Sequence, residues 1–400
     1  MNWRALCALL AATLALNGSF FMLVPLFPIY ATATLGLSAA AVGLVLAIRQ
    51  FLQNAPMVLG GAIADRFSAR RAMVCGLLVR ALAFGALGFA TDLPTLTLVL
   101  GLAALSGSLF DVSCLAAIAR LVPQGDRVRA FGLVSMAFVL GSSLGPLLGT
   151  AAYQLGFGFV CLVGAAWLVV AALAIVALVP DWEPVGNSVP SVRVNLSSAF
   201  ADRAFVRLSI ISSGFWYLGS VLYVALPLHV QALTGRTEVV GFLFSLYALL
   251  VLLFQYPVIR LSARRLSPSD RLAIGLAALG TGYLLVGATL GAGVVVVAVG
   301  VLALGRMLIE PTYNELVTQL SPPGKVGTYV GLGYLGLGIG GALGNLSGGL
   351  LFDLAKALDS LWVPWLLYGL LGLGLAVAFR AMRVGAAGRP AAPVLVRHSE

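Results

Sequence analysis

Long apolar segments alternate with short polar ones along the whole chain. A helix needs about 20 mainly apolar residues to cross the hydrocarbon core of a bilayer. On that length the pattern predicts twelve membrane-spanning helices, near residues 5–33, 38–64, 72–90, 94–119, 129–152, 155–179, 205–232, 237–261, 271–289, 292–318, 326–353 and 361–381. The predicted fold class is therefore an all-α polytopic membrane protein.

Composition agrees with this pattern and excludes other classes. Of the 400 residues 60% are hydrophobic and 10% are charged, whereas an average soluble domain has about 25% charged residues. The 24 basic residues outnumber the 14 acidic ones, but they lie in short loops and form no single basic face of the kind that binds nucleic acid. Cysteine and histidine spacings are unlike those of metal sites, so we expect a lipid bilayer as the surroundings and no metal or cofactor.

The basic residues of the loops predict how the chain is oriented. Twelve spans place both termini on the same side of the membrane. That side carries most of the loop arginines, and the other side keeps only Arg236 and Lys356. An excess of Lys and Arg in short loops marks the cytoplasmic side, so we expect both termini in the cytoplasm.

An internal repeat divides the chain into two halves. A shift of 199 positions places Asp111 on Glu310 and Pro123 on Pro322, and four glycines of each half also coincide. Parallel repeats of this kind occur in transporters whose substrate site lies between the halves. We expect a six-helix bundle at 1–180, a cytoplasmic linker at 181–204, a second bundle at 205–382 and a cytoplasmic tail at 383–400.

The segment GGAIADRFSARR, residues 60–71, lies between the second and third predicted spans. It resembles the loop signature of the major facilitator superfamily through Gly61, Asp65, Arg66, Arg70 and Arg71, and it departs from that signature at Ser68 and Ala69. The resemblance implies that Asp65 meets the positive N-terminal end of the eleventh helix and that the arginines join neighbouring helix ends. The alternative is that a short cytoplasmic loop simply collects arginines.

A second motif lies in the fifth predicted span. Gly132, Gly141, Gly145, Pro146 and Gly149 resemble the antiporter motif of the same superfamily, which in family terms ends in a second glycine where Thr150 stands here. Glycines three or four residues apart let helices approach closely, and proline bends a helix. The alternative is ordinary small-residue packing. The stretches LAIRQFLQNAPMVLGGAIADRF (46–67), SGSLFD (106–111) and LIEPTYNEL (308–316) resemble multidrug-resistance transporters of the MdtH type. This resemblance implies export of drugs in exchange for protons across the bacterial inner membrane.

Ionisable residues inside the predicted spans are candidates for function, because charges in hydrocarbon are costly and are usually functional or paired. They are Arg49, Arg80, Asp111, Arg306 and Glu310, with Glu315 nearer the cytoplasm. Arg306 and Glu310 are four residues apart on one helix and can form a pair that sets helix packing alone. We favour Asp111, at the depth of Arg80, as the proton-coupling residue, and Glu310 as a substrate-facing or structural charge.

The predicted function is that of a monomeric, proton-coupled secondary transporter that exports small amphipathic or apolar compounds. The candidate substrate cavity contains Arg49, Gln53, Asn54, Tyr30, Trp216 and Tyr247. A phosphate-binding loop of the GxxxxGK[ST] type is not found in the sequence, so transport driven directly by ATP is not expected. The alternatives are a symporter or uniporter that imports a sugar, peptide or siderophore, and a polytopic membrane enzyme or lipid-handling protein.

Overall fold

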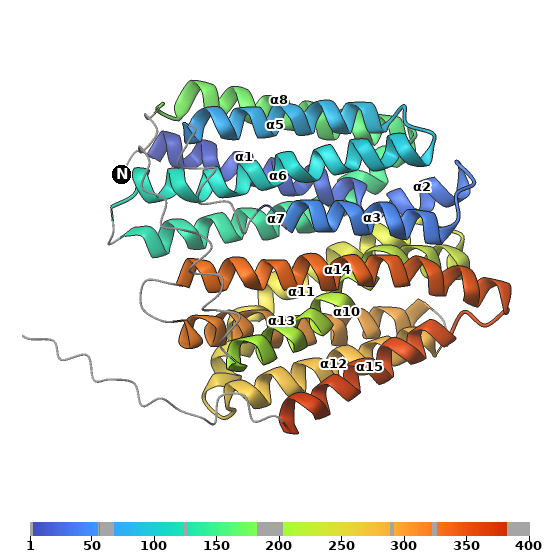
Figure 1. Cartoon of the computed structure of the whole chain (residues 1–400). Helices are drawn as coiled ribbons and strands as arrows, with labels where there is room; N and C mark the ends of the chain where they lie inside the picture. The colour runs from blue at the N-terminus through green and yellow to red at the C-terminus, as the bar shows by residue number, and fades with distance from the viewer. Residues whose placement is uncertain are drawn as a thin grey trace, which may run out of the picture.

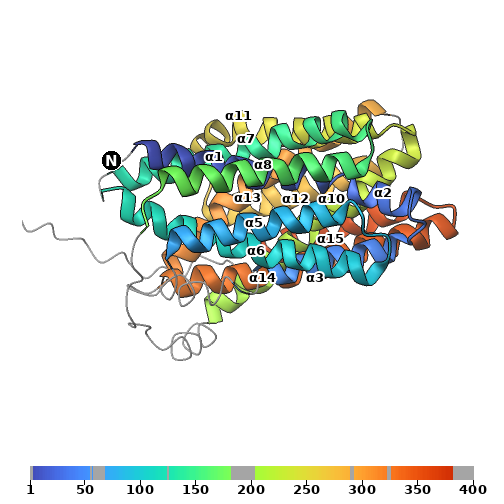
Figure 2. The same cartoon turned by 90° about the horizontal axis from the view of Figure 1, so that it is seen from above.

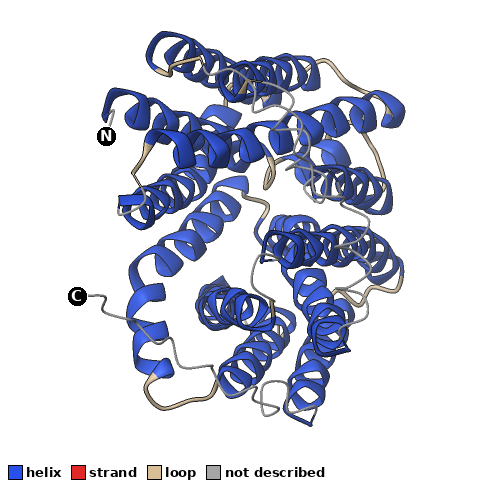
Figure 3. Cartoon of the chain, turned by 60° about the vertical axis from the view of Figure 1, so that its left-hand side comes forward, coloured by secondary structure: helices blue, strands red, loops and turns tan. Residues whose placement is uncertain are grey.

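The computed structural model describes residues 3–54, 56, 68–123, 126–181, 203–288, 292–321 and 326–381. Within these ranges the regular structure is helical and no strand occurs (Figure 3). The helices are α1 (Trp3–Leu23), α2 (Phe27–Ala33), α3 (Ala39–Asn54), α5 (Ala69–Leu87), α6 (Leu93–Leu121), α7 (Arg127–Tyr153), α8 (Phe157–Leu178), α10 (Arg203–Thr234), α11 (Thr237–Ala263), α12 (Pro268–Gly287), α13 (Ala292–Leu320), α14 (Val326–Ala357) and α15 (Val363–Ala381).

These helices match the twelve predicted spans. The first span is divided into α1 and α2 by a turn, and Pro28 stands in the first turn of α2, where a missing N–H costs no helical hydrogen bond. Among the described residues, nine spans are long and apolar enough to cross a membrane. The other three helices are α3, of which 16 residues are described, and α5 and α12, which begin with charged residues. The chain is a multi-pass helical membrane protein.

The repeat seen in the sequence reappears in the helix boundaries. Helix α6 begins and ends 199 residues before α13, and the starts of α5 and α7 precede those of α12 and α14 by the same interval. Helices α1 to α8 pack around one apolar cluster and α10 to α15 around another. In Figure 1 the two groups of helices lie one above the other. Residues 182–202 of the predicted linker and the tail from 382 onward lie outside the described residues.

The two groups of helices meet mainly through two pairs, α3 with α14 and α7 with α11, which lie on opposite sides of the molecule (Figure 2). These pairs correspond to each other under the repeat. A Cβ atom added at Gly43 would lie 2.6 Å from the carbonyl oxygen of Asn345, and one at Gly241 would lie 2.9 Å from that of Pro146. Glycine is therefore needed where the helices of the two halves cross.

These close crossings are concentrated toward one end of the molecule. That end holds the turns at 34–38, 154–156, 235–236 and 358–362, and we call it the arginine-poor end. The opposite end holds the starts of α1, α5, α7 and α10 and most of the described loop arginines, and we call it the arginine-rich end. From the arginine-poor end the contact of α3 with α14 continues as far as Gln50, which lies against Gly341.

Candidate functional site

Two arginines of the first half lie deep among the helices. Arg49 on α3 is 7% exposed and Arg80 on α5 is 2% exposed. The Arg49 guanidinium donates hydrogen bonds to the side-chain oxygens of Gln53 and, at 3.3 Å, of Gln50. Its carbon lies 4.1 Å from the centre of the Phe20 ring, a distance typical of a cation–π contact. Among the described residues Arg49 is thus held by amides and an aromatic face and forms no ion pair with a carboxylate.

Arg80 lies between aromatic rings and a glycine. Its guanidinium carbon is 5.6 Å from the ring centre of Phe20 and 5.3 Å from that of Phe84. A Cβ atom at Gly107 would collide with Nη1 of Arg80, so the guanidinium occupies space that only glycine leaves open on α6. The buried Nε and Nη1 atoms find no hydrogen-bond partner among the described residues.

Asp111 lies one helical turn beyond Gly107 on α6. The charges of Asp111 and Arg80 act on each other, but these two side chains do not form one of the direct ion pairs found in the described part of the chain. An ionised carboxylate inside a bundle normally has a cation or several donors close by. Asp111 is therefore the less compensated of the two deep carboxylates.

The second half contains a complete pair. Arg306 Nε lies 2.8 Å from Glu310 Oε2, one turn apart on α13, and Arg306 also shares a hydrogen bond with Tyr247 of α11. Both charged side chains are only partly buried. Glu310 thus has a fixed partner on its own helix, whereas Asp111 depends on a neighbouring helix.

The repeat relates these two arrangements. Position 306 corresponds to 107 and position 310 to 111. In the second half the guanidinium belongs to the residue at the equivalent position, Arg306. In the first half that position is Gly107, and the guanidinium of Arg80 reaches across it from α5. In each half a guanidinium therefore lies about one turn before the carboxylate. It comes from the same helix in the second half and from the neighbouring helix α5 in the first half.

Tyrosines connect the charged groups of the two halves. Tyr223 on α10 interacts electrostatically with both Arg49 and Arg306. Tyr334 on α14 interacts electrostatically with Asp111 and Glu310. Charged residues of both halves thus act on the same tyrosines, and we call Arg49, Arg80, Asp111, Arg306 and Glu310 together the central charged cluster.

The predicted cavity residues divide into two groups. Gln53 and Tyr247 contact the arginines of the central charged cluster, and Asn54 donates to the backbone oxygen of Gln50. Tyr30 instead stacks on Phe157 with 4.1 Å between ring centres, and Trp216 lies edge-on to Tyr313. Packing among aromatic rings therefore accounts for Tyr30 and Trp216.

Glu315 also lies apart from the central charged cluster. It pairs at 2.8 Å with Arg271, whose side chain is 5% exposed, and so joins α12 to α13. Gly107 and Tyr334 are not among the site residues predicted from the sequence. A sequence signal existed for Gly107, because the repeat places it opposite a charged residue.

The glycine motif of α7 forms a packing surface. Cβ atoms at Gly141 and Gly145 would lie 2.8 and 2.6 Å from the backbone of Gly18 on α1. In the second half, Gly340 and Gly344 press in the same way on the backbone of α10. Gly132 is different, because a Cβ there would meet nothing within 4 Å. In this structure the motif glycines from 141 onward permit a close crossing of α7 and α1.

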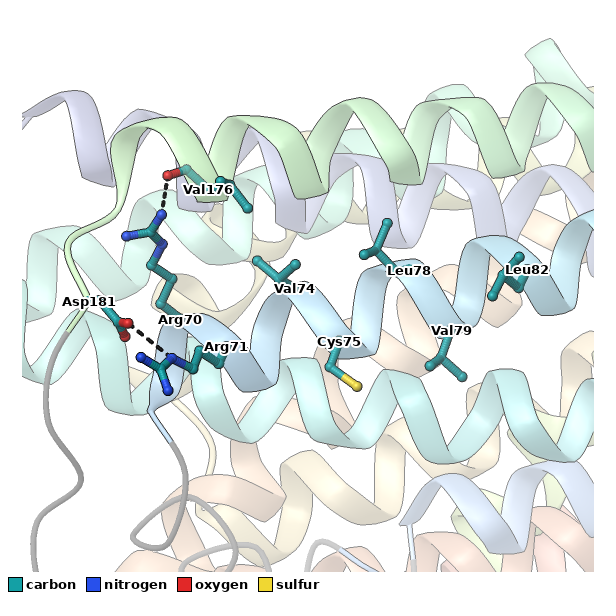
Figure 4. A pocket seen from close by; sticks show the side chains of 9 residues that line it. All are labelled: Arg70, Arg71, Val74, Cys75, Leu78, Val79, Leu82, Val176 and Asp181. Carbon is teal, nitrogen blue, oxygen red and sulfur yellow. Dashed lines mark hydrogen bonds and ion pairs between the residues drawn. The ribbon is translucent and has the colours of Figure 1, made fainter.

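The described part of the loop signature lies at the arginine-rich end, while Gly61, Asp65 and Arg66 lie outside the described residues. Arg70 donates to the backbone oxygen of Val176, and Arg71 Nε lies 3.0 Å from Asp181 Oδ2 (Figure 4). Ser68 donates to the other oxygen of Asp181. The Ser68 hydroxyl, together with Arg71, holds the pKa of Asp181 below its ordinary value. These contacts join the start of α5 to the end of α8.

Comparisons with known proteins agree with this arrangement. A family model described as Major Facilitator Superfamily matches residues 9–345. The chain is 34% identical over 354 residues to "Multidrug resistance protein MdtH" of Aeromonas salmonicida (strain A449), covering 88% of this chain and 89% of the relative. It is 34% identical over 353 residues to the protein of the same name from Enterobacter sp. (strain 638), covering 88% of each.

Solved structures share the fold at low sequence identity. The nucleoside transporter NupG has a TM-score of 0.82 at 16% identity and covers 96% of this chain and 99% of its own. The peptide transporter POT in complex with sulfate has a TM-score of 0.80 at 17% identity and covers 96% and 95%. The family match identifies a transporter rather than an enzyme. This chain belongs to the major facilitator superfamily.

Proposed function

We propose that the protein exports small amphipathic or apolar compounds in exchange for protons. Relatives named as multidrug resistance proteins, at 34% identity over most of the chain, support the substrate class. The observation that carries the proton coupling is the difference between the two deep carboxylates. Glu310 is paired directly with Arg306, while Asp111 has Arg80 only at longer range.

Transport of this kind requires the two halves to move against each other around a fixed site. We assign these moving parts to residues 1–180 and 205–382, joined by a linker at 181–204. The central charged cluster draws on both parts. The close crossings near the arginine-poor end support a state that is closed there. With both termini in the cytoplasm of a bacterial inner membrane, this state would be closed to the outside.

Asp111 is the group that we assign to proton binding. Its charge is costly in the bundle interior and is offset by a cation on another helix. Movement of one half against the other changes the surroundings of Asp111, because Tyr334 of α14 in the second half acts on it, and so changes the balance between the ionised and the protonated carboxylate. Glu310 keeps its partner during such a movement, because Arg306 belongs to the same helix. We assign Glu310 to substrate contact or to structure.

The test uses purified protein in liposomes that carry a pH gradient and a fluorescent amphipathic cation. We expect wild-type protein to move the dye in the direction opposite to the flow of protons down their gradient. The variant Asp111→Asn should lose this gradient-driven movement but keep dye-for-dye exchange, which needs no proton transfer. Glu310→Gln is the comparison variant, and any loss it causes should lower gradient-driven transport and exchange by the same factor, because the charge that it removes is assigned to substrate contact or to structure.

Three results would change the proposal. Gradient-driven transport retained in Asp111→Asn and lost in Glu310→Gln would exchange the two roles. Dye and protons moving in the same direction would indicate a symporter. Dye movement that is unaffected by the gradient in wild-type protein would indicate a uniporter.

A further inference from the structure

A hollow of about 600 Å³ runs along the outer side of α5 at the arginine-rich end (Figure 4). Apolar side chains form its wall, and the charged side chains of Arg70, Arg71 and Asp181 lie at the end that we call its mouth. The residues that line it are Arg70, Arg71, Val74, Cys75, Leu78, Val79, Leu82, Val176 and Asp181. Leu78 is 41% exposed and Leu82 is 73% exposed. In a membrane protein such exposed apolar side chains face the lipid, so the hollow opens toward acyl chains.

Two guanidinium groups stand at the mouth of this hollow. Arg70 gives one N–H to the backbone oxygen of Val176, and Arg71 gives one to Asp181. A guanidinium carries five N–H donors, and the Arg71 side chain is 80% exposed. Among the described residues that line the hollow, Arg70, Arg71 and Asp181 together carry a net charge of one positive unit. The guanidinium N–H groups that form no hydrogen bond within the described part of the chain are suited to phosphate oxygens.

The length of the hollow agrees with one lipid leaflet. From Arg71 to Leu82 the helix rises about 16 Å at 1.5 Å per residue. The hydrocarbon core of a bilayer is about 30 Å thick, so one leaflet spans about half of that. A lipid phosphate held at Arg71 would therefore place an acyl chain along Val74, Leu78 and Leu82.

We propose that this hollow is a binding site for an anionic phospholipid. The phosphate is held by Arg70 and Arg71, and an acyl chain lies on the apolar wall of α5. Basic residues beside an apolar surface at a membrane interface are the recognised combination for such lipids. This inference is independent of the direction and the proton coupling of transport.

The repeat supplies an internal comparison. The positions equivalent to Arg70 and Arg71 on α12 are Ser269 and Asp270. Asp270 is engaged at the helix start, where it exchanges hydrogen bonds with Ser267. The second half therefore has an acidic residue where the first half has a basic one, and we expect the site in the first half only.

Lipid binding is measured on the full-length protein in detergent by native mass spectrometry, with phosphatidylglycerol, phosphatidylcholine or inorganic phosphate added. We expect phosphatidylglycerol to bind most tightly. Neutralising Arg70 and Arg71 together should weaken its binding by at least about fivefold, since one basic residue near an anionic surface contributes about that factor. Arg264→Gln with Arg265→Gln is the matched control, because it removes the same charge at the same end of the molecule outside the hollow.

Cys75 reports where the lipid binds, because its exposed thiol lines the hollow. With the other exposed thiol removed by Cys7→Ser, phosphatidylglycerol should slow alkylation of Cys75. Inorganic phosphate should not, because it lacks the acyl chain. Arg70→Gln with Arg71→Gln should abolish the protection, and Arg70→Lys with Arg71→Lys, which keeps the charge, should retain most of it.

The proposal is overturned by equal Cys75 protection from phosphatidylglycerol and phosphatidylcholine. It is also overturned by equal phosphatidylglycerol binding in the wild type and the Arg70→Gln, Arg71→Gln variant. Should that variant fail to fold, the salt dependence of Cys75 protection in the wild type still tests the proposal. Protection that depends on the charge of the mouth must weaken between about 0.05 and 0.5 M salt as the Debye length shortens, and unchanged protection contradicts the proposal.

Discussion

The carboxylate of Asp353, near the end of α14, accepts hydrogen bonds from the backbone N–H groups of Ala39 and Ala40 at the start of α3, at 3.1 and 2.7 Å. These are two of the N–H groups that a helix leaves unpaired at its N-terminus, where partial positive charge also collects. Gly349 lies against Ala39 in the same crossing. The contact joins the two halves at the arginine-poor end.

This contact suggests a counterpart at the other end of the same two helices. The family resemblance implies that Asp65, after α3, meets the N-terminal end of α14. Asp353, near the end of α14, meets the N-terminal end of α3. Asp65 lies outside the described residues, so the Asp353 contact is the one that the structure shows between these helix ends.

We predict that Asp353→Asn shifts the population toward states open at the arginine-poor end. A charge at a helix N-terminus contributes about 0.3–1 kcal/mol when exposed and up to about 2 kcal/mol when partly buried, which corresponds to a several-fold change in population. Spin labels at Thr34 and Leu358 should show longer distances in the variant. The control is Asp359→Asn, which removes the same charge nearby and keeps a residue that tolerates the positive φ of 51° found there. Identical distance distributions in Asp353→Asn and wild type would disprove this role.

We predict that Gly107→Ala impairs transport, because the new methyl group displaces the Arg80 guanidinium from α6. The contact is with the far end of a flexible side chain, which can move aside, so the stability should change little while the transport rate falls because Arg80 is displaced. The liposome assay measures this directly. Gly85→Ala on α5, where a Cβ meets nothing within 4 Å, should transport normally. Normal transport by Gly107→Ala would show that the position of Arg80 does not matter.

We predict that Gly145→Ala lowers the thermal stability of the protein, because its Cβ would lie 2.6 Å from the backbone oxygen of Gly18 on α1. The expected cost is about 1–3 kcal/mol. Gly132→Ala is the matched control within the same motif, and it should be neutral or stabilising because the site is open. The melting temperatures of the two variants, compared with that of the wild type, test this prediction. If both melt like wild type, the motif glycines are not needed for helix packing.

We predict that the two ends of α11 lie on opposite sides of the membrane, with Arg264 in the cytoplasm. Cysteines at Arg236 and Arg264, both exposed positions, replace the two exposed native thiols after Cys7→Ser and Cys75→Ser. An impermeant thiol reagent added to intact cells should label the cysteine at position 236 alone. Labelling at 264 from outside would invert the orientation, and labelling at both would contradict a single spanning helix.

We predict that the contact of Asp181 with Ser68 and Arg71 persists throughout the physiological pH range. The pKa of Asp181 is lowered from its ordinary value of 3.8, so its stabilising contribution is present above that value and is lost as the pH falls through the lowered pKa. The difference in melting temperature between wild type and Asp181→Asn should stay constant from about pH 8 to about pH 5 and shrink only in stronger acid. A difference that already vanishes near neutral pH would contradict the lowered pKa.

The sequence by itself determined the helical fold, the repeat and the position of most spans. Backbone N–H and C=O groups in lipid must form hydrogen bonds within a helix, and the thickness of the bilayer sets the length of that helix. The hydropathy of the sequence is therefore nearly sufficient to locate the spans. The contact of Arg306 with Glu310 could also be predicted, because residues four apart on a helix share a face. The repeat likewise indicated that α6 and α13 would have matching ends, as they do.

Only the tertiary structure decided which helices cross and what each side chain meets there. Asp353 and Ala39 are 314 positions apart, and local periodicity does not connect them. Arg80 rests on Gly107 of α6, on the Phe20 ring of α1 and on the Phe84 ring of its own helix, while Tyr30 stacks on Phe157. Apolar faces in a membrane helix look alike in sequence, so the choice among neighbours follows from the fit of small and large side chains across helices, which exists only once the helices are packed.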